Sequence, residues 1–342
     1  MLNSDFLAIE LDKGSLNLVK KQVKENLSKN YLILKLLISG VCRSDLKEIK
    51  QLRTIRRDFG HEFIGEVISC SKGLKIGIGD WVVYDPHIKL KSRSSGFAEY
   101  LMAEGKIENL NNGFIKVPKK VSLRRLVFIE PLACANHCVN QLFKHLKIEN
   151  ASGLNIAIIG AGTAGSLIGL IIKHYGGHVI FFNRSSKRID FMRENGLFNK
   201  NEYKKLSEKI EKKFDVVIPT TSFIFPSIMK KCLQIVKNNG VIHLFGGTKR
   251  SIKYKFLNQD IDKIRRKEKL VRFSYNDKRI KFSGTHGALT EDFVKAINYL
   301  SYKNQFSVEK IITAEVGLKQ LPLILKTLSV SGGMGKTIVI PG

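Results

Sequence analysis

Cysteine is scarce in this chain, and its spacing argues against two common classes of protein. The 342 residues contain five cysteines, and no two of them form a Cys-x-x-Cys pair. An odd and scattered set does not fit a disulfide framework or a cysteine-rich structural zinc site. We therefore expect a protein of a reducing, cytoplasmic compartment.

The sequence also lacks the signals of an exported or membrane-spanning protein. No basic segment followed by an apolar one opens the chain, so we expect no secretory signal. The longest apolar stretch, residues 154–172, is interrupted by four glycines, which argues against a membrane span. An apolar share of 43% over 342 residues is typical of a folded protein with two domains.

Acidic residues are few: the chain has 30 of them against 58 lysines and arginines, a formal net charge of +28. Such a charge raises nucleic-acid binding as a hypothesis. No helix-turn-helix, RNP-like or Cys/His finger pattern accompanies the basic segments, so we expect no nucleic-acid partner. A solvated basic surface is the first interpretation, and a field that attracts an anionic substrate or cofactor is the second. The basic residues gather in 47–57, 116–125 and 249–272.

Apolar periodicity changes along the chain. Up to about residue 120, short apolar runs are broken by turn residues, which predicts a mostly β domain. Farther on, strand-like runs alternate with segments of helical length, which predicts parallel βαβ units, a doubly wound sheet and the α/β fold class. The expected strands are 31–38, 63–68, 81–84, 155–159, 178–182, 214–218, 241–245 and 336–340, and a helix is expected over 291–300.

A Gly-x-Gly-x-x-Gly motif follows the expected strand at 155–159. Gly160 permits a tight turn, Gly162 lets the backbone approach a diphosphate, and Gly165 lets helix pack on strand. Thr163 and Ala164 complete the turn, where the free N–H groups of a helix N-terminus favour an anion. Because a strand precedes the motif and a helical segment follows it, the sequence predicts a dinucleotide site.

The next expected strand indicates which dinucleotide binds. An NAD site usually ends that strand with an acidic residue that accepts a hydrogen bond from the ribose. Here the position holds Asn183, followed by Arg184 and, farther on, Arg188. Arginine donors suit a 2′-phosphate, so NADP(H) is favoured. NAD(H) remains the alternative, with Asn183 serving the hydroxyl and Arg184 a surface charge or a stacking partner of the adenine.

Residues upstream offer ligands for a metal. Cys42, His61, Glu62 and Glu130 supply the thiolate, imidazole and carboxylate groups of a catalytic zinc that keeps one position open. Each residue alone has a simpler interpretation. A lone cysteine is usually a small core residue, and a lone histidine is usually a partly buried residue with its hydrogen bonds made. Their occurrence together with the dinucleotide motif favours the metal site.

With these motifs the sequence resembles the zinc-dependent medium-chain alcohol dehydrogenases, and within them the polyol (sorbitol dehydrogenase-like) branch. The resemblance implies a GroES-like, mostly β catalytic domain from residues 1–124 and 288–342. A Rossmann domain with a doubly wound parallel sheet would be inserted at 125–287. The motifs that carry it are Gly-Val-Cys-x-Ser-Asp at 40–45, Gly-His-Glu at 60–62, Gly-Asp-Trp-Val-Val at 79–83, Gly-Phe-Ala-Glu-Tyr at 96–100, Glu-Pro-Leu-Ala at 130–133 and Gly-Lys-Thr-Ile-Val at 335–339.

The resemblance also implies roles for single residues. Glu130 stands where the family has a fourth ligand or a carboxylate near the metal-bound water. Ser44 matches the hydroxyl that takes a proton from the substrate oxygen, and Asp45 matches a group that orients the site. The implied zinc ligands are Cys42, His61 and Glu62, and further cofactor contacts are implied at Phe245, Gly246, Ser283, Gly284 and, near the diphosphate, Lys336.

Two departures from the family pattern matter. The segment 85–96 is short and has no cysteine, so we expect one catalytic zinc per chain and no structural zinc. Many relatives have a histidine shortly after the Ser-Asp pair as the end of a proton relay, whereas this chain offers Lys47. The exit of the proton to solvent therefore remains open.

The expected activity is hydride transfer between NADP(H) or NAD(H) and a polyol, a sugar-derived alcohol or another secondary alcohol. Within this class, a phosphorylated polyol of the ribitol-5-phosphate kind or an amino alcohol is the alternative. A nucleic-acid-binding protein on a Rossmann scaffold and a zinc-free reductase are remoter hypotheses. The expected partners are a small-molecule substrate and further copies of the chain, as a homodimer or homotetramer, without nucleic acid or membrane.

Overall fold

The computed structural model describes residues 5–23, 30–52, 59–248, 254, 256–302 and 306–342. The chain divides into two compact units, Met1–Glu130 with Phe293–Gly342 (unit 1) and Pro131–Asp292 (unit 2). The sequence suggested dividing points at 124/125 and 287/288. The observed points fall inside the helices α4 (Ile129–Leu146) and α9 (Thr290–Ser301), where no turn residues mark a boundary.

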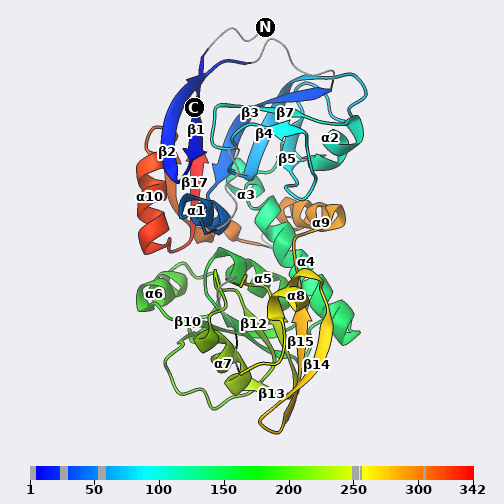
Figure 1. The fold of residues 1–342 in the computed structure, drawn as a ribbon, viewed down its shortest axis with the longest axis vertical. Helices are drawn as coiled ribbons and strands as arrows, with labels where there is room; N and C mark the ends of the chain where they lie inside the picture. Colours follow the sequence, from blue (N-terminus) through cyan, green and yellow to red (C-terminus); the bar gives the residue numbers. More distant parts are fainter. Residues whose placement is uncertain (1–4, 24–29, 53–58, 249–253, 255, 303–305) are drawn as a thin grey trace. The chain divides into compact units, whose positions relative to one another are not determined.

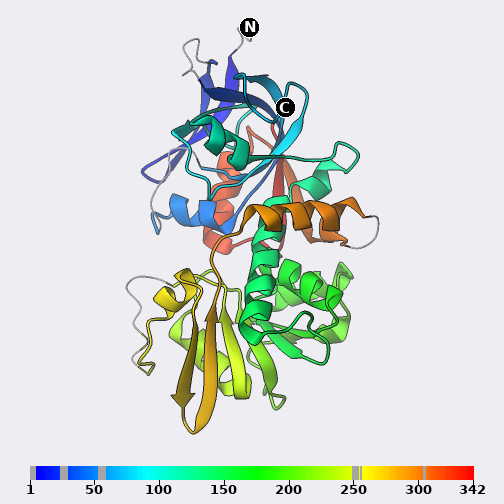
Figure 2. The same ribbon diagram turned by 90° about the vertical axis from the view of Figure 1, so that its right-hand side faces the viewer.

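Unit 1 is mostly β, as its broken apolar runs predicted. Its described part contains a two-stranded sheet, β1-β2, and a larger sheet with the order β16-β17-β3-β4-β5-β8, in which β7 pairs with β3 and β6 (Figures 1 and 2). The elements are β1 (Phe6–Asp12), β2 (Ser15–Lys21), β3 (Tyr31–Gly40), α1 (Arg43–Ile49), β4 (Glu62–Cys70), β5 (Trp81–Tyr84), β6 (Ser92–Arg93), β7 (Tyr100–Glu104), α2 (Ile107–Gly113), β8 (Phe114–Lys116), α3 (Leu123–Leu126), η2 (Val308–Ile311), β16 (Ile312–Gly317), α10 (Leu321–Ser331) and β17 (Lys336–Ile340).

Strand β3 is the centre of this sheet. Its apolar sequence buries most of its side chains, because β4 and β7 both pair with it and leave it no free edge. Its last residue, Gly40, lies opposite Glu62, the first residue of β4, and also opposite Ile338 of β17. The end of β3, the start of β4 and the middle of β17 therefore meet at Gly40.

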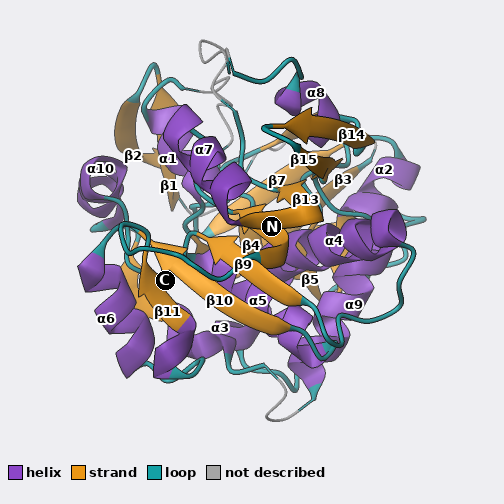
Figure 3. Ribbon diagram, turned by 90° about the horizontal axis from the view of Figure 1, so that it is seen from below, coloured by secondary structure: helices purple, strands orange, loops and turns teal. Residues whose placement is uncertain are grey.

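Unit 2 contains the doubly wound sheet that the alternating pattern predicted. In its described part the order is β11-β10-β9-β12-β13-β15-β14, and all pairs are parallel except β14-β15 (Figure 3). The expected strand at 241–245 begins earlier and ends one residue earlier. The elements are β9 (Asn155–Ile159), α5 (Thr163–His174), β10 (His178–Asn183), α6 (Ser186–Glu194), η1 (Lys200–Glu202), β11 (Tyr203–Lys205), β12 (Phe214–Pro219), α7 (Pro226–Ile235), β13 (Val236–Leu244), α8 (Ile261–Arg266), β14 (Leu270–Tyr275) and β15 (Lys278–Gly284).

The edge strand β14 had no clear signal in the sequence. It alternates between exposed and half-buried residues, so the strong apolar run that marks the central strands is missing. Its hairpin with β15 closes on Asn276 and Asp277, which both have positive φ values, of 43° and 61°. These residue types tolerate that conformation in a two-residue turn.

Buried His137 on α4, inside unit 2, lies between two carboxylates, of which Asp292 is buried and Glu268 half-buried. The two ring nitrogens of His137 lie 2.8 Å from Asp292 and 2.8 Å from Glu268. The other carboxylate oxygen of Asp292 accepts from Asn136 at 2.7 Å and from Asn140 at 2.9 Å. A neutral imidazole has only one N–H, so two carboxylate partners require the doubly protonated ring. Burial lowers the pKa of His137, but the hydrogen bonds and charges of Asp292 and Glu268 outweigh it and raise that pKa above 6.5.

No helix among the described residues is both long enough and apolar enough to span a membrane.

We predict that His137→Gln destabilises unit 2, because it removes the cation and leaves the buried carboxylate of Asp292 without its charged partner. Breaking such a pair costs about 3 kcal/mol. The expected drop in Tm at about pH 6 is about 6 °C or more. The measurement is thermal unfolding of both proteins, with the exposed His178→Gln as a matched control that leaves Tm unchanged.

The difference should depend on pH with a definite sign. The pKa of His137 is raised in the folded state, so its stabilisation is complete below about 6.5 and is lost as the pH rises through the raised pKa. The Tm gap between wild type and His137→Gln should therefore narrow toward alkaline pH. A gap that widens or stays constant contradicts the protonated bridge.

Candidate metal and dinucleotide sites

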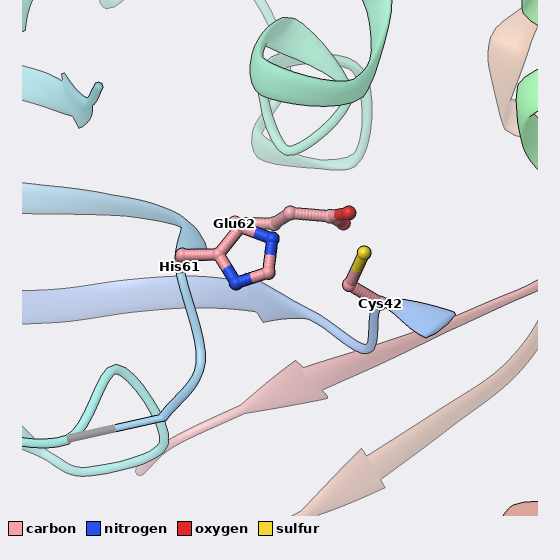
Figure 4. Close-up of side chains that lie close together, drawn as sticks. All are labelled: Cys42, His61 and Glu62. Atoms are coloured by element: carbon pink, nitrogen blue, oxygen red, sulfur yellow. The ribbon is translucent and has the colours of Figure 1, made fainter. Parts of the chain in front are cut away.

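The structure brings Cys42, His61 and Glu62 together in unit 1. Cys42 follows β3 and precedes α1, while His61 and Glu62 stand at the start of β4. Because β3 and β4 pair with Gly40 opposite Glu62, one potential ligand atom from each residue lies within 4.8 Å of the others (Figure 4). Among the described residues this is the group that could hold a metal ion.

Asp45 and Ser44 lie against this group. One carboxylate oxygen of Asp45 accepts from the backbone N–H of Cys42 at 2.8 Å, and the other lies 3.4 Å from Nδ1 of His61. The Ser44 hydroxyl lies 3.4 Å from Nε2 of His61. A carboxylate at Nδ1 favours the proton on that nitrogen, which leaves the Nε2 lone pair for a metal.

The charges of the group favour the ligand form of the cysteine. Burial raises the pKa of Cys42, but the charge of His61 and a hydrogen bond to it outweigh burial and lower that pKa. Burial lowers the pKa of His61, whereas the charges of Cys42 and Asp45 raise it well above its usual value. The thiolate is the form that binds a metal.

Lys336 lies at the metal-site carboxylate. Its side chain is buried, its Nζ contacts the carboxylate of Glu62, and it donates to the carbonyl of Val41 at 3.2 Å. Burial lowers the pKa of Lys336 to about 8. The sequence analysis expected this lysine near a diphosphate, which stays a prediction, and within unit 1 its ammonium contacts Glu62. The physical reason is the pairing of β17 with β3, which the sequence does not reveal.

Glu130 lies near this group without joining it. Its carboxylate is buried at the start of α4, and its charge raises the pKa of Cys42. It is not part of the group of three within 4.8 Å, so a direct ligand role is not shown.

The donor set of the group fits a zinc ion. One thiolate sulfur, one imidazole nitrogen and one carboxylate oxygen match the three protein ligands of a catalytic zinc site with an open position. Asp45 supplies the carboxylate behind the histidine that such sites use to orient the ring.

In unit 2, the glycine-rich turn has the geometry that its motif predicted. Gly160 follows β9 with a φ of 120°, and α5 begins at Thr163 with Gly162 as its cap. A Cβ atom on Gly165 would lie 2.0 Å from the carbonyl oxygen of Gly160, so only glycine fits there. The first turn of α5, including Ala164, therefore presents its free N–H groups at the end of β9.

Asn183 ends β10 and supports this turn. Its side-chain oxygen accepts from the N–H of Ala161 at 3.3 Å, and its amide nitrogen donates to the carbonyl of Ser185 at 3.1 Å. Arg184 is exposed beside it. Half-buried Arg188 has its Nη1 4.0 Å from where a Cβ of Gly162 would stand.

The other expected cofactor residues lie at the carboxyl ends of parallel strands. Phe245 and Gly246 follow β13, and Ser283 and Gly284 end β15. In open α/β sheets, ligands bind outside these ends. The hydroxyl of Ser283 is buried and lies among histidine side chains.

Sequence reasoning missed the polar residues that support these sites. His145 and His243 place their Nδ1 atoms 2.6 and 2.7 Å from the Ser283 hydroxyl. Thr220 donates to the carbonyl of Gly160 at 2.8 Å. No motif announces such partners, because they come from distant elements and form no local pattern.

Comparison with known proteins agrees with this architecture. Residues 28–108 match the alcohol dehydrogenase GroES-like domain. An uncharacterised zinc-type alcohol dehydrogenase-like protein of Haemophilus influenzae is 27% identical over 210 residues, which cover 56% of this chain and only 60% of the relative.

Solved structures with the same fold cover nearly the whole chain. Galactitol-1-phosphate dehydrogenase from Escherichia coli has a TM-score of 0.73 and 18% identity, over 98% of this chain and 100% of that one. Acetophenone reductase from Geotrichum candidum, in complex with NAD, has a TM-score of 0.73 and 19% identity, over 99% and 98%. Residues 28–108 therefore match the alcohol dehydrogenase GroES-like domain, and the chain shares the fold of these dehydrogenase structures.

Proposed function

We propose that this protein is a zinc-dependent oxidoreductase that transfers a hydride between a nicotinamide dinucleotide and an alcohol or its carbonyl counterpart. The observation that carries the proposal is the grouping of Cys42, His61 and Glu62 within 4.8 Å. The glycine-rich turn at Gly160 of the same chain supports the dinucleotide. Its aligned H. influenzae relative is a zinc-type alcohol dehydrogenase-like protein by name.

Cys42, His61 and Glu62 would hold the zinc, which supplies a Lewis acid for the substrate oxygen when bound. The hydroxyl of Ser44, beside His61, relays the proton that the alcohol releases: it takes that proton and passes its own O–H proton on toward solvent. Asp45 holds His61 and the backbone of Cys42 in place through its two oxygens. Glu130 adds a buried carboxylate close to the thiol.

We also propose a single zinc per chain and NADP(H) as the preferred cofactor. The segment 85–96 has no cysteine for a structural zinc. The oxygen and the nitrogen of the Asn183 side-chain amide both form hydrogen bonds with the backbone. This side chain is therefore a poorer hydrogen-bond acceptor for the ribose hydroxyl than a carboxylate would be. Exposed Arg184, next in the chain, is suited to a 2′-phosphate. Arg188, on α6 (Ser186–Glu194), has its Nη1 4.0 Å from where a Cβ of Gly162 would stand.

A neutral polyol or sugar-derived secondary alcohol is the first substrate candidate. A phosphorylated polyol is the second, because the chain carries a net charge of +28 and shares its fold with a galactitol-1-phosphate dehydrogenase. A homodimer or homotetramer, a cytoplasmic location and the absence of a nucleic-acid partner remain predictions.

Purified protein should contain one zinc per chain, and Cys42→Ser should lose it, because the hydroxyl is a much poorer ligand than the thiolate. Turnover should fall about 1,000-fold. Metal analysis and steady-state kinetics measure both. Cys70→Ser, a half-buried cysteine outside the group, is the matched control and should keep the metal. Full zinc content in Cys42→Ser, or full activity without zinc, rules out the proposed site.

The activity itself should appear as reduction of NADP+ by a polyol in a panel of neutral polyols, amino alcohols and phosphorylated polyols. In Ser44→Ala, kcat should fall about 100-fold or more with zinc content unchanged, because the proton acceptor is lost. Ser44→Thr keeps a hydroxyl and should retain most of the rate. No turnover with any alcohol in the presence of either cofactor would contradict the proposal.

Arg184→Ala should lower kcat/KM for NADP+ about 10- to 100-fold, the value of a lost charge-assisted contact to phosphate. The kcat/KM for NAD+ should change little. The ratio of kcat/KM for NADP+ to that for NAD+ therefore measures the contribution of the 2′-phosphate contact. Lys209→Ala, an exposed lysine, is the control for general loss of charge. Equal effects on both cofactors would show that Arg184 does not select NADP+.

A further inference from the structure

His145 and His243 have no role in the chemistry proposed above, yet they share one buried hydroxyl in unit 2. Ser283 and His243 are fully buried, and they lie side by side because β15 and β13 pair at these residues. The Ser283 hydroxyl lies 2.7 Å from Nδ1 of His243 and 2.6 Å from Nδ1 of half-buried His145 on α4. Nε2 of His243 lies 2.9 Å from the carbonyl oxygen of Cys138, which is also on α4.

The direction of each of these hydrogen bonds follows from its partners. A carbonyl oxygen only accepts, so Nε2 of His243 donates to Cys138. Burial lowers the pKa of His243 to about 3, so the ring is neutral and its Nδ1 accepts. The single O–H of Ser283 therefore donates to His243, and its oxygen accepts the N–H at Nδ1 of His145. The series of hydrogen bonds thus begins at the donor of His145.

This series begins and ends on the same helix. His145 and Cys138 lie about two turns apart on α4. Between them the series passes through Ser283 and His243, which stand one residue before the carboxyl ends of β15 and β13. The hydrogen bonds therefore tie the carboxyl ends of two neighbouring strands to one helix.

The strand order indicates which half of a dinucleotide would meet these ends. The glycine-rich turn, which suits the diphosphate, follows β9. Asn183 and Arg184, which suit the adenosine ribose, stand at the end of β10 on one side of β9, and the order on its other side is β12-β13-β15. Since the diphosphate joins the two halves of the cofactor, the nicotinamide half would extend toward the ends of β13 and β15.

We propose that His145 and His243 are positioning residues, which act through Ser283 to hold the ends of β13 and β15 in the form that binds the nicotinamide half of the cofactor. This inference rests on the dinucleotide site of the proposed function and does not involve the zinc. The histidines act on the backbone of the two strands, since His243 and Ser283 are fully buried. A backbone that is already in its binding form lowers the cost of ordering it when the cofactor binds.

The test compares two replacements of His145 that differ in one donor. His145→Asn offers an amide N–H in place of the Nδ1 donor, whereas His145→Leu has a similar size and leaves the Ser283 oxygen without its partner. His145→Leu should bind NADPH about tenfold more weakly, and His145→Asn should stay within about threefold of wild type. Isothermal titration calorimetry measures the affinities.

A fragment of the cofactor separates positioning from a general loss of structure. 2′-Phospho-ADP-ribose has the adenosine and the diphosphate but no nicotinamide ring, so wild type and His145→Leu should bind it equally. A partly unfolded unit 2 would lose affinity for the fragment as well. If wild type prefers NADH, then NADH and ADP-ribose are the two ligands compared. His178→Leu, at an exposed position of β10, is the matched control and should bind both ligands as wild type does.

A second background isolates the path of the effect, because His145 also forms a hydrogen bond to the backbone of Glu268. Ser283→Ala alone should weaken NADPH binding about as much as His145→Leu does. Adding His145→Leu to Ser283→Ala should then change the affinity little, since the hydroxyl that couples the two is gone. Ser283→Ala also replaces His145→Leu if that variant does not fold by circular dichroism.

The outcomes separate this inference from the proposed function. Equal binding of NADPH by His145→Leu and wild type overturns the positioning role while the dinucleotide site stands. Equal losses for NADPH and for the fragment also overturn it, since the effect would not be confined to the nicotinamide half. If wild-type protein binds neither NADPH nor NADH, the proposed function fails, and this inference fails with it.

Discussion

The pairing of β3 with β4 is the constraint on which the metal site depends. It sets Gly40 opposite Glu62 and so places Cys42, two residues farther along, beside the His61–Glu62 pair. A shift of one residue in this register would turn the side chains of β4 to the opposite face of the sheet. The buried apolar side chains of β3 hold the register, because the wrong face would expose them. The chemistry of unit 1 is thus fixed by a backbone ladder and a hydrophobic core.

Much of the fold was predictable because its signals are local. Apolar runs located β5, β9 and β17 at their observed bounds, and the glycine motif located the turn at Gly160. Cys42, His61 and Glu62 could be grouped by their ligand chemistry and by resemblance but not by geometry, since nothing in their spacing implies the strand pairing that joins them. The edge strand β14 was missed because its residues alternate between exposed and half-buried, so it lacks the apolar run that marks the central strands.

The supporting residues could not be predicted, for a related reason. Lys336 meets Glu62 across 274 positions of sequence only because β17 pairs with β3. His137 meets Asp292 and Glu268 through the packing of α4 in unit 2. A lysine or histidine in a sequence is most simply interpreted as a surface residue, and burial changes that interpretation only when the partner is known.

The charges around Cys42 indicate why a dication suits this place. The carboxylates of Asp45 and Glu130 lie near Cys42, and the negative charge of each carboxylate raises the pKa of the thiol. Glu62 adds a further carboxylate, and among the described residues Lys336 contacts Glu62 while Arg43 interacts with Cys42. The charges of Cys42 and Asp45 raise the pKa of His61, and a bound dication would be stabilised by the same anions.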